Sequence, residues 1–391
     1  MATVKLCDTS MLGTRNSRSN SQLKSRDAAN DLPNRSAVCS LISAGLDTGL
    51  ESNPSLDTKP TVSIGLPVYN GENFLAEAIE SVLAQTFQDY ELILSDNAST
   101  DRTAEICRHY ASQDRRVRYY RSPAHHSPTW NYNRVFSLAK GSYFKWAAHD
   151  DIFEPTFIEK TLALLIQNPA AVLSFSGVDV IDEEAKTILP YDVVLATNSH
   201  SPSCRFQEMI SLKHRCYDIF GLIKTDVLAQ TPLIEAYAGS DRTLLARLSL
   251  LGSFETVPEP LFKARKHAKQ SIAMLRNPRH KHLRLHDYAA WFDPDNKGKI
   301  IFPNWRIFEE YLRAIRAVSL SKKDRLMCYF VVTRWIFSNQ NWAKLGRDLA
   351  IALLQIFSRL RSPLSEDSKT HQPSLHLGHL PAVHVKEKAS R

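Results

Sequence analysis

Short apolar runs alternate with amphipathic segments between residues 61 and 147. The runs predict strands, because they are rich in β-branched and other apolar residues and end at polar residues or Pro; they cover Thr61–Val68, Tyr90–Leu94, Val117–Tyr120 and Tyr143–Ala147. Between them, apolar residues recur at helical spacing and predict helices over Phe74–Leu83, Arg102–Ala111 and Asn131–Ala139. This alternation predicts an α/β fold with a largely parallel sheet and helices on both faces.

The last third of the chain contains three further amphipathic segments, Arg306–Leu320, Leu326–Phe337 and Leu345–Leu360. They can pack as a helical subdomain on the α/β domain. Because Arg residues interrupt them, they can also lie on an anionic membrane surface. The two arrangements are compatible.

Both ends of the chain lack aromatic residues and carry few apolar ones, so they cannot bury enough surface to offset chain entropy. The predicted organisation is a disordered segment at 1–58, an α/β domain at 59–275, a basic helical subdomain at 276–361 and a disordered tail at 362–391.

Charged residues are distributed unevenly along the 391 residues of the chain. Residues 59–262 carry 18 Lys or Arg against 25 Asp or Glu, whereas residues 263–391 carry 25 against 10. A basic third suits nucleic acid, an anionic membrane or a phosphorylated ligand. We expect no nucleic-acid partner, because the segment has no recognisable nucleic-acid-binding module.

The six cysteines form no C-x-x-C pair, so we expect neither a zinc ribbon nor a disulfide framework. This use of cysteine suits a reducing compartment. No apolar run reaches the roughly 18–20 residues of a membrane span, and the first residues lack the apolar stretch of a signal peptide. The expected location is cytoplasmic, with peripheral contact at the inner membrane face as a further expectation.

Polar loops follow three of the predicted strands: Tyr69–Glu72, Ser95–Asn97 and His149–Asp151. Ligands of parallel sheets bind beyond the carboxyl ends of the strands, so these loops should converge on one cleft. Neither a G-x-G-x-x-G nor a P-loop motif is present. The acidic side chains favour Mg²⁺ or Mn²⁺ and the hydroxyls of a nucleotide sugar.

These motifs resemble those of family 2 glycosyltransferases, which have the GT-A fold. The resemblance covers about residues 60–272 and rests on Pro67–Asn70, Gln85–Phe87, Ser95–Asp101 and the stretch from Gly141 to Asp151, in that order. It implies an inverting transferase that uses a nucleotide-sugar donor and a divalent cation.

By position, the resemblance assigns roles to single residues. Pro67, Tyr69 and Glu72 would line the base and ribose, and Asp96 would accept hydrogen bonds from the base. Asp150 would contact the ribose or metal, and Asp151 would hold the metal against the diphosphate. In the closing segment, His267 would lie near the diphosphate or metal, with Lys266 and Lys269 adding positive charge.

The chain departs from the family pattern at the first acid of the metal motif, where it has Ala148 or His149. A basic residue often found near the nucleotide is replaced by candidates at His125, His126 and Arg134. The departure at the metal motif keeps open a catalytically inactive module that binds glycan or a partner protein.

Asp241 begins an apolar helical pattern and matches the family's catalytic base better than Asp226 or Glu235. The residue also suits a first-turn helix acid, and the two roles are compatible. We therefore expect a glycosyltransferase acting on a hydroxyl of a saccharide or lipid-linked acceptor, in cell-surface polysaccharide synthesis. A nucleotidyltransferase is disfavoured, because the loop after the first strand is neither Gly-rich nor basic.

Overall fold

The computed structural model describes residues 59–361, apart from 192, 194, 196, 269, 271–288, 290–291 and 294–295. The predicted disorder of 1–58 and 362–391 therefore lies outside the described residues. So does the predicted domain boundary at 275/276, and the proposed division into domains stays a prediction.

A single sheet of nine strands runs through the described part in the order β3-β2-β1-β4-β8-β6-β9-β5, with β7 beside β6. The strands are β1 Val62–Val68, β2 Tyr90–Asp96, β3 Val117–Arg121, β4 Tyr143–Trp146, β5 Ile152–Phe153, β6 Ala171–Ile181, β7 Thr187–Tyr191, β8 Leu222–Lys224 and β9 Ser253–Arg265. From β3 to β4 all pairings are parallel, and β6 pairs β9 in parallel. Antiparallel pairs join β4 to β8, β8 to β6, β7 to β6 and β5 to β9.

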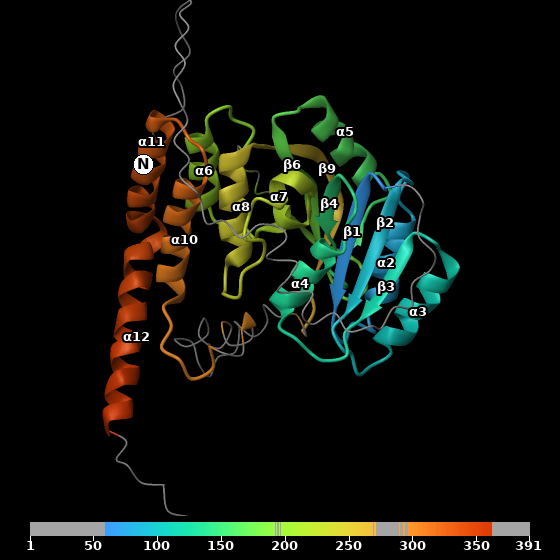
Figure 1. Ribbon diagram of the computed structural model, residues 1–391, viewed down its shortest axis with the longest axis horizontal. Coiled ribbons are helices and arrows are strands. Elements are labelled where there is room, and N and C mark those ends of the chain that lie inside the picture. Colours follow the sequence, from blue (N-terminus) through green and yellow to red (C-terminus); the bar gives the residue numbers. More distant parts are fainter. Residues whose placement is uncertain are drawn as a thin grey trace, which may run out of the picture.

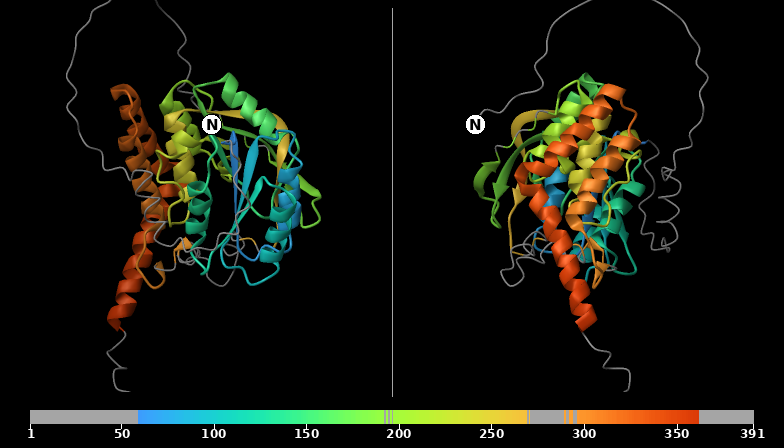
Figure 2. Two further views of the ribbon diagram at one scale, coloured as in Figure 1. Left: turned by 45° about the vertical axis from the view of Figure 1, so that its right-hand side comes forward. Right: turned by 90° about the vertical axis from the view of Figure 1, so that its left-hand side faces the viewer.

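Helices cover both faces of this sheet (Figures 1 and 2). They are α2 Leu75–Leu83, α3 Thr103–Gln113, α4 Pro128–Ser137, α5 Phe157–Gln167, α6 Pro202–Ser211, α7 Thr225–Leu228 and α8 Ser240–Leu251. All seven residues of β1 are buried, as expected of a central strand with helices on either side. The predicted α/β class and helix-covered sheet are confirmed.

Several predicted helices begin earlier in the structure than the sequence indicated, among them the one predicted from Asn131. The helix expected at Asn131 begins at Pro128, because the Ser127 side chain accepts a hydrogen bond from the Trp130 amide and caps the helix. Pro at the first helical position fits there, since its missing N–H would be unpaired in any case.

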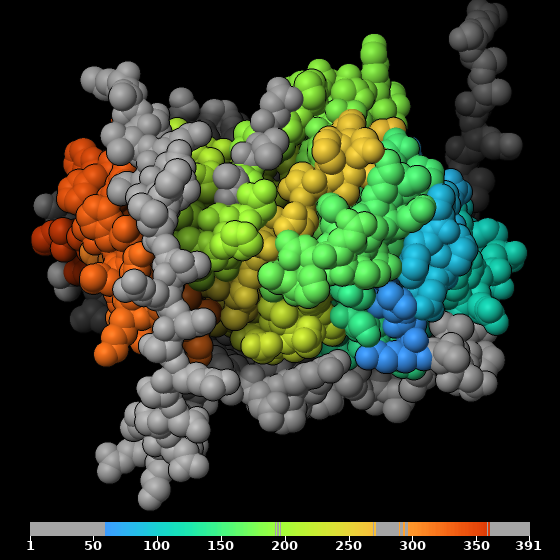
Figure 3. All heavy atoms as spheres, turned by 90° about the horizontal axis from the view of Figure 1, so that it is seen from above, coloured from blue at the N-terminus to red at the C-terminus, as the bar shows by residue number. Residues whose placement is uncertain are grey.

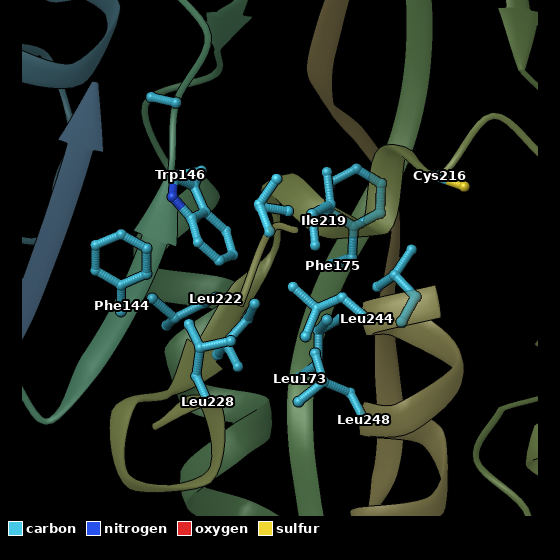
Figure 4. Close-up of a cluster of buried hydrophobic side chains, with 14 of the residues drawn as sticks. Phe144, Trp146, Leu173, Phe175, Cys216, Ile219, Leu222, Leu228, Leu244 and Leu248 are labelled. Carbon is cyan, nitrogen blue, oxygen red and sulfur yellow. The ribbon is translucent and has the colours of Figure 1, made fainter. Parts of the chain in front are cut away.

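The core continues across the sheet into α8 (Figure 4). Phe144 and Trp146 of β4 and Leu173 and Phe175 of β6 are buried together with Leu244 and Leu248 of α8, among other apolar side chains. The N-terminus of α8, which holds Asp241, is thereby fixed relative to the sheet.

The three predicted C-terminal helices are present as α10 Pro303–Ala317, α11 Lys322–Phe337 and α12 Asn341–Arg361. The helix α10 packs on α8, α11 packs on α6, and α12 packs on α10. They form an outer layer at one edge of the molecule, on the side away from β1–β3 (Figures 1 and 3). Packing on the α/β part, one of the two arrangements expected from the sequence, is confirmed.

Within the part that the structure describes, no helix combines the length and the apolar character that crossing a bilayer requires. Cys107, Cys216 and Cys328 are buried free thiols, as expected. Cys204, in contrast, is disulfide-bonded, which the sequence did not predict.

Candidate active site

A cavity of about 600 Å³ opens where the predicted loops converge. It is lined by residues after β1, after β2, at the start of α4, after β4, before the short 3₁₀ helix Tyr217–Phe220 and at the end of β9. Of the residues predicted for the site, Pro67, Tyr69, Asp150, Asp151 and His267 line this cavity. The expectation that ligands bind beyond the carboxyl ends of parallel strands therefore predicted the position of the cavity.

The loop after β1 is locked to the turn after β2 by hydrogen bonds. The Asn70 amide donates to Ser99 Oγ at 3.0 Å, and Asn70 Oδ1 accepts from the Thr100 amide at 2.8 Å. Asn70 has a φ of 51°, a left-handed conformation that Asn tolerates better than most residues. This side of the cavity is therefore held in place before any ligand binds.

Gly71 lies where these loops meet the Asp150 loop. Its amide donates to Thr103 Oγ1 at 2.9 Å, and a Cβ at this position would lie 2.7 Å from both His149 Cδ2 and Val68 Cγ2. Only a residue without a side chain lets the loops approach so closely.

We expect Gly71→Ala to destabilise the fold by about 1–3 kcal/mol, the usual cost of inserting a methyl group into a packed site, and to weaken ligand binding in the cavity. Urea unfolding monitored by circular dichroism measures the first effect. Gly346→Ala is the matched control, because no atom lies within 4 Å of its Cβ and Ala favours the helix α12. Equal stability of Gly71→Ala and the wild type would contradict the close packing.

Asp96 is the last residue of β2 and is fully buried. Its carboxylate accepts hydrogen bonds from the Ser99 amide at 2.8 Å and the Tyr119 hydroxyl at 3.0 Å. The sequence placed it in a loop, but β2 extends two residues further because Asp96 pairs with Val68 and Arg121. Asp96 does not line the cavity, and its predicted contact with the base stays a prediction.

Asn97, the next residue, does reach the cavity, and its side chain holds the loop that precedes α4. Asn97 Nδ2 donates to the His126 carbonyl at 2.8 Å, and Oδ1 accepts from the His126 amide at 2.9 Å. His125 in this loop lies with its ring centroid 4.2 Å from that of Tyr69. Two aromatic rings thus border this end of the cavity.

Asp150 and His267 form the centre of the opposite wall. His267 Nε2 lies 2.9 Å from Asp150 Oδ2, and both side chains are largely buried. Burial opposes ionisation of Asp150, but the hydrogen bond from His267 and the nearby His149 and His267 rings lower its pKa overall. Asp150 is therefore the ionised carboxylate of this wall.

Asp151 lies beside it in a different environment. Burial and the neighbouring Asp150 charge raise the pKa of Asp151 well above its usual range, although its Oδ1 accepts a hydrogen bond from the Arg265 amide at 2.8 Å. Two adjacent buried carboxyl groups resist sharing two negative charges, and a cation between them and a ligand would relieve that repulsion.

Arg265 holds both acids in place. Its side chain is almost fully buried; Nε donates to the Asp150 carbonyl at 2.9 Å, and one terminal nitrogen donates to the carbonyls of Asp182 and Glu183 at 3.0 and 2.7 Å. The other terminal nitrogen forms an ion pair with Glu77 at 2.5 Å. This residue joins β9, α2 and the loops after β4 and β6.

Basic side chains lie at the rim, and two of them, Arg215 and Lys266, are cations. Arg215, Lys266, His125 and His126 line the cavity, as does His149. Arg134 lies outside the lining, where it donates to Ser95 Oγ at 3.2 Å, and Lys269 lies outside the described residues.

Asp241 lies at the start of α8, as predicted, but not in the cavity lining. Its carboxyl group is hydrogen-bonded to Cys216, which is flanked by the lining residues Arg215 and Tyr217. Surrounding protein raises the pKa of Asp241, while Arg242 opposes the shift. Asp241 keeps partial exposure, and its contact with Cys216 places it next to the lining residues Arg215 and Tyr217.

Glu72 is exposed and faces away from the cavity, where its carboxylate accepts from the Arg102 amide at 3.1 Å. Its predicted role stays a prediction. The sequence analysis missed Arg215, Tyr217 and Gln270, which line the cavity. No motif marks Arg215 and Tyr217, and only their approach to β4 and β9 in the fold reveals them.

Among the described residues, no group of three His, Cys, Asp or Glu side chains is arranged to hold a metal ion. A carboxylate and an imidazole are nevertheless adjacent at Asp150 and His267. Mg²⁺ in particular is commonly bound by one or two carboxylates, with substrate phosphates and water as the other ligands, so these residues fit a cation that arrives with a diphosphate.

The chain is similar to several known proteins. Residues 63–227 match the family described as glycosyl transferase family 2. An uncharacterized glycosyltransferase of Rickettsia typhi is 28% identical over 262 residues, which cover 60% of this chain and 80% of that protein. The putative glycosyltransferase EpsE of Bacillus subtilis is 34% identical over 129 residues, which cover 33% of this chain and 46% of that protein. Among solved structures, S. aureus TarS 1-349 in complex with UDP-GlcNAc has a TM-score of 0.44 and 13% identity, covering 77% of this chain and 92% of that chain.

Proposed function

Because residues 63–227 match the family described as glycosyl transferase family 2, we propose that the chain is an inverting glycosyltransferase. It moves a sugar from a nucleoside-diphosphate donor to a hydroxyl of a saccharide or lipid-linked acceptor, in cell-surface polysaccharide synthesis. The observation that carries the proposal is the cavity at the strand ends, which combines an aromatic border, an ionised acid and a basic rim.

The lining residues suggest how the nucleotide-sugar donor would be oriented in the cavity. Tyr69 and His125 offer ring faces for the base at one end, and Asp150 with His267 lies at the other end, where the diphosphate would be bound. Arg215 and Lys266 at the rim offset the negative charge that develops on the departing diphosphate.

A divalent cation, Mn²⁺ or Mg²⁺, would be held by Asp150, with His267 as a second donor and Asp151 beside them. When bound, the cation supplies Lewis-acid stabilisation of charge on the diphosphate oxygens. The sequence assigned this role first to Asp151, but Asp150 is the acid that contacts His267.

Asp241 would take the proton of the acceptor hydroxyl as the new bond forms. An alcohol is a weak nucleophile until a positioned carboxylate accepts its proton in the transition state. For this, the acceptor must approach the segment Arg215–Tyr217, next to which Asp241 lies.

Binding of UDP, dTDP, GDP, ADP and CDP to the purified protein, followed by thermal shift with Mn²⁺ or with EDTA, tests the proposal. We expect one base to raise the melting temperature, and only with the cation. Stabilisation by none of the five would favour the alternative from the sequence, an inactive module that binds glycan or a partner protein.

The cation site has its own test in Asp150→Ala. In Mn²⁺ this variant should weaken binding of the selected nucleoside diphosphate at least about tenfold, whereas in EDTA it should match the wild type. Glu184→Ala, which removes an exposed acid between β6 and β7, should change neither value. Equal losses with and without Mn²⁺ would mean that Asp150 binds no cation.

We propose a cytoplasmic location at the inner membrane face. The basic C-terminal third, which complements an anionic membrane surface, supports it.

A further inference from the structure

The outer faces of α11 and α12 expose large apolar side chains. Ten of the eighteen large apolar side chains that are exposed in the described part of the chain lie between residues 322 and 361. In a folded soluble domain, exposed apolar residues are usually scattered, so this concentration needs an explanation.

The exposed apolar residues of α11 form a line on the side of the helix opposite its buried residues. Cys328, Val331, Val332 and Trp335 face inward and are buried. Leu326, Phe330 and Phe337 follow at spacings of four and seven residues on the opposite side, and Phe337 is 74% exposed.

The helix α12 has apolar side chains on both its inner and its outer side, and Leu345, Ile351 and Ala352 are buried on the inner one. Its inner side includes the polar residues Asn341 and Asp348, and Asp348 accepts hydrogen bonds from the Asn304 amide and side chain at 2.7 and 2.8 Å. Its outer side is apolar and comprises Trp342, Leu349, Leu353, Leu354, Ile356 and Phe357. An amphipathic helix normally buries its apolar face, so the outer face of α12 requires an apolar partner.

Charge identifies that partner. Residues 322–361 contain eight Lys or Arg and two Asp. One of these acids, Asp348, is buried, and the other, Asp324, accepts a hydrogen bond from Ser321 at the start of α11. Lys323 and Arg334 lie exposed beside the apolar line of α11, and Arg347 is exposed on α12. Apolar residues flanked by cations and almost free of exposed acids complement an anionic lipid surface.

We propose that the outer faces of α11 and α12 bind the surface of an anionic lipid bilayer, with the apolar side chains inserted at the level of the headgroups. The two helices lie along the same edge of the molecule and face outward together (Figures 1 and 2). This surface is separate from the cavity, so binding needs neither donor nor acceptor.

Sedimentation of the full-length protein with vesicles tests the proposal. We expect binding to phosphatidylcholine vesicles that contain about a third phosphatidylglycerol, and weak binding to phosphatidylcholine alone. The double variant Leu353→Ser, Phe357→Ser should lower the partition coefficient roughly 10- to 100-fold, because each exposed side chain contributes part of its full burial energy. Ile166→Ser, Ile188→Ser is the matched control, since both residues are exposed apolar side chains on α5 and β7.

Three outcomes would overturn the proposal. One is that the wild type binds neither kind of vesicle, and another is that it binds both equally. The third is a dimer in light scattering that the double variant abolishes without vesicle binding, which would make this face a contact between two copies of the chain. Since no nucleotide is present, each outcome is independent of the proposed transferase activity.

Discussion

Asp241→Asn is expected to lower the rate of sugar transfer by about 10²–10⁴-fold, the range for loss of general-base catalysis, and to leave donor binding almost unchanged. The substitution keeps the shape of the side chain and removes its ability to accept a proton. Asp241 lies outside the cavity lining, so it should contribute little to the affinity for the donor.

The surroundings of Asp241 suit a base. Burial by protein raises its pKa, and a carboxylate with a higher pKa holds the abstracted proton more firmly. Because only the ionised form acts as a base, transfer by the wild type should increase as the pH rises through this raised pKa. That increase should be absent in Asp241→Asn.

Release of nucleoside diphosphate from the donor selected in the binding panel, measured with acceptor present, gives the rate. Asp226→Asn is the matched control, because Asp226 is an exposed first-turn acid of α7 and was a weaker candidate from the sequence. A variant as active as the wild type would remove Asp241 from the mechanism, and its role would then be limited to the start of α8.

Local pattern was enough to predict the N-terminal half of the fold. The strands β1–β4 and the helices between them are adjacent in sequence, and their pairings are parallel as the alternation implies. The pairing of β9 with both β6 and β5 was not predictable in the same way. It joins Ser253–Arg265 to strands far away in the sequence and depends on which buried surfaces fit together.

In the candidate site too, local sequence pattern predicted some residues and not others. Tyr69 follows β1 directly and Asp150 lies in the loop after β4, and the rule for parallel sheets placed both in the cavity. Asp96 follows the predicted strand Tyr90–Leu94 in the same pattern, but β2 extends to include it, and its carboxylate accepts hydrogen bonds from Ser99 and Tyr119. Arg215 enters the site from an irregular segment, for which the sequence provides no periodic signal.

The role of Arg265 was equally hidden, because its partners lie far away in the chain: Glu77 is 188 residues away, and Asp150 is 115. The sequence placed Arg265 at the start of a basic segment, a position that suits an exposed side chain. In the fold it is instead a buried cation with four partners, and replacing it should have a large effect.

Arg265→Met is expected to lower the free energy of unfolding by about 3–5 kcal/mol, because it removes three hydrogen bonds from a buried charged group, each of which contributes up to about 1.5–3 kcal/mol. Methionine fills similar space but donates no hydrogen bond. The carbonyls of Asp150, Asp182 and Glu183 would each lose their donor, and a partly buried acceptor without a partner is still costly. Glu77 is partly exposed and can regain water, so the carbonyl groups account for much of the loss.

Urea unfolding of the full chain measures this effect, and Arg102→Met is the matched control. Arg102 forms an ion pair with Glu105 at 2.9 Å in which both side chains are mostly exposed, so its removal should leave the unfolding midpoint unchanged. A loss below about 1 kcal/mol for Arg265→Met would show that its hydrogen bonds are replaced by water, contrary to its burial. Under the expected outcome, Arg265 is what holds the Asp150 loop against β9, and the variant should also bind nucleoside diphosphate more weakly at temperatures where it is still folded.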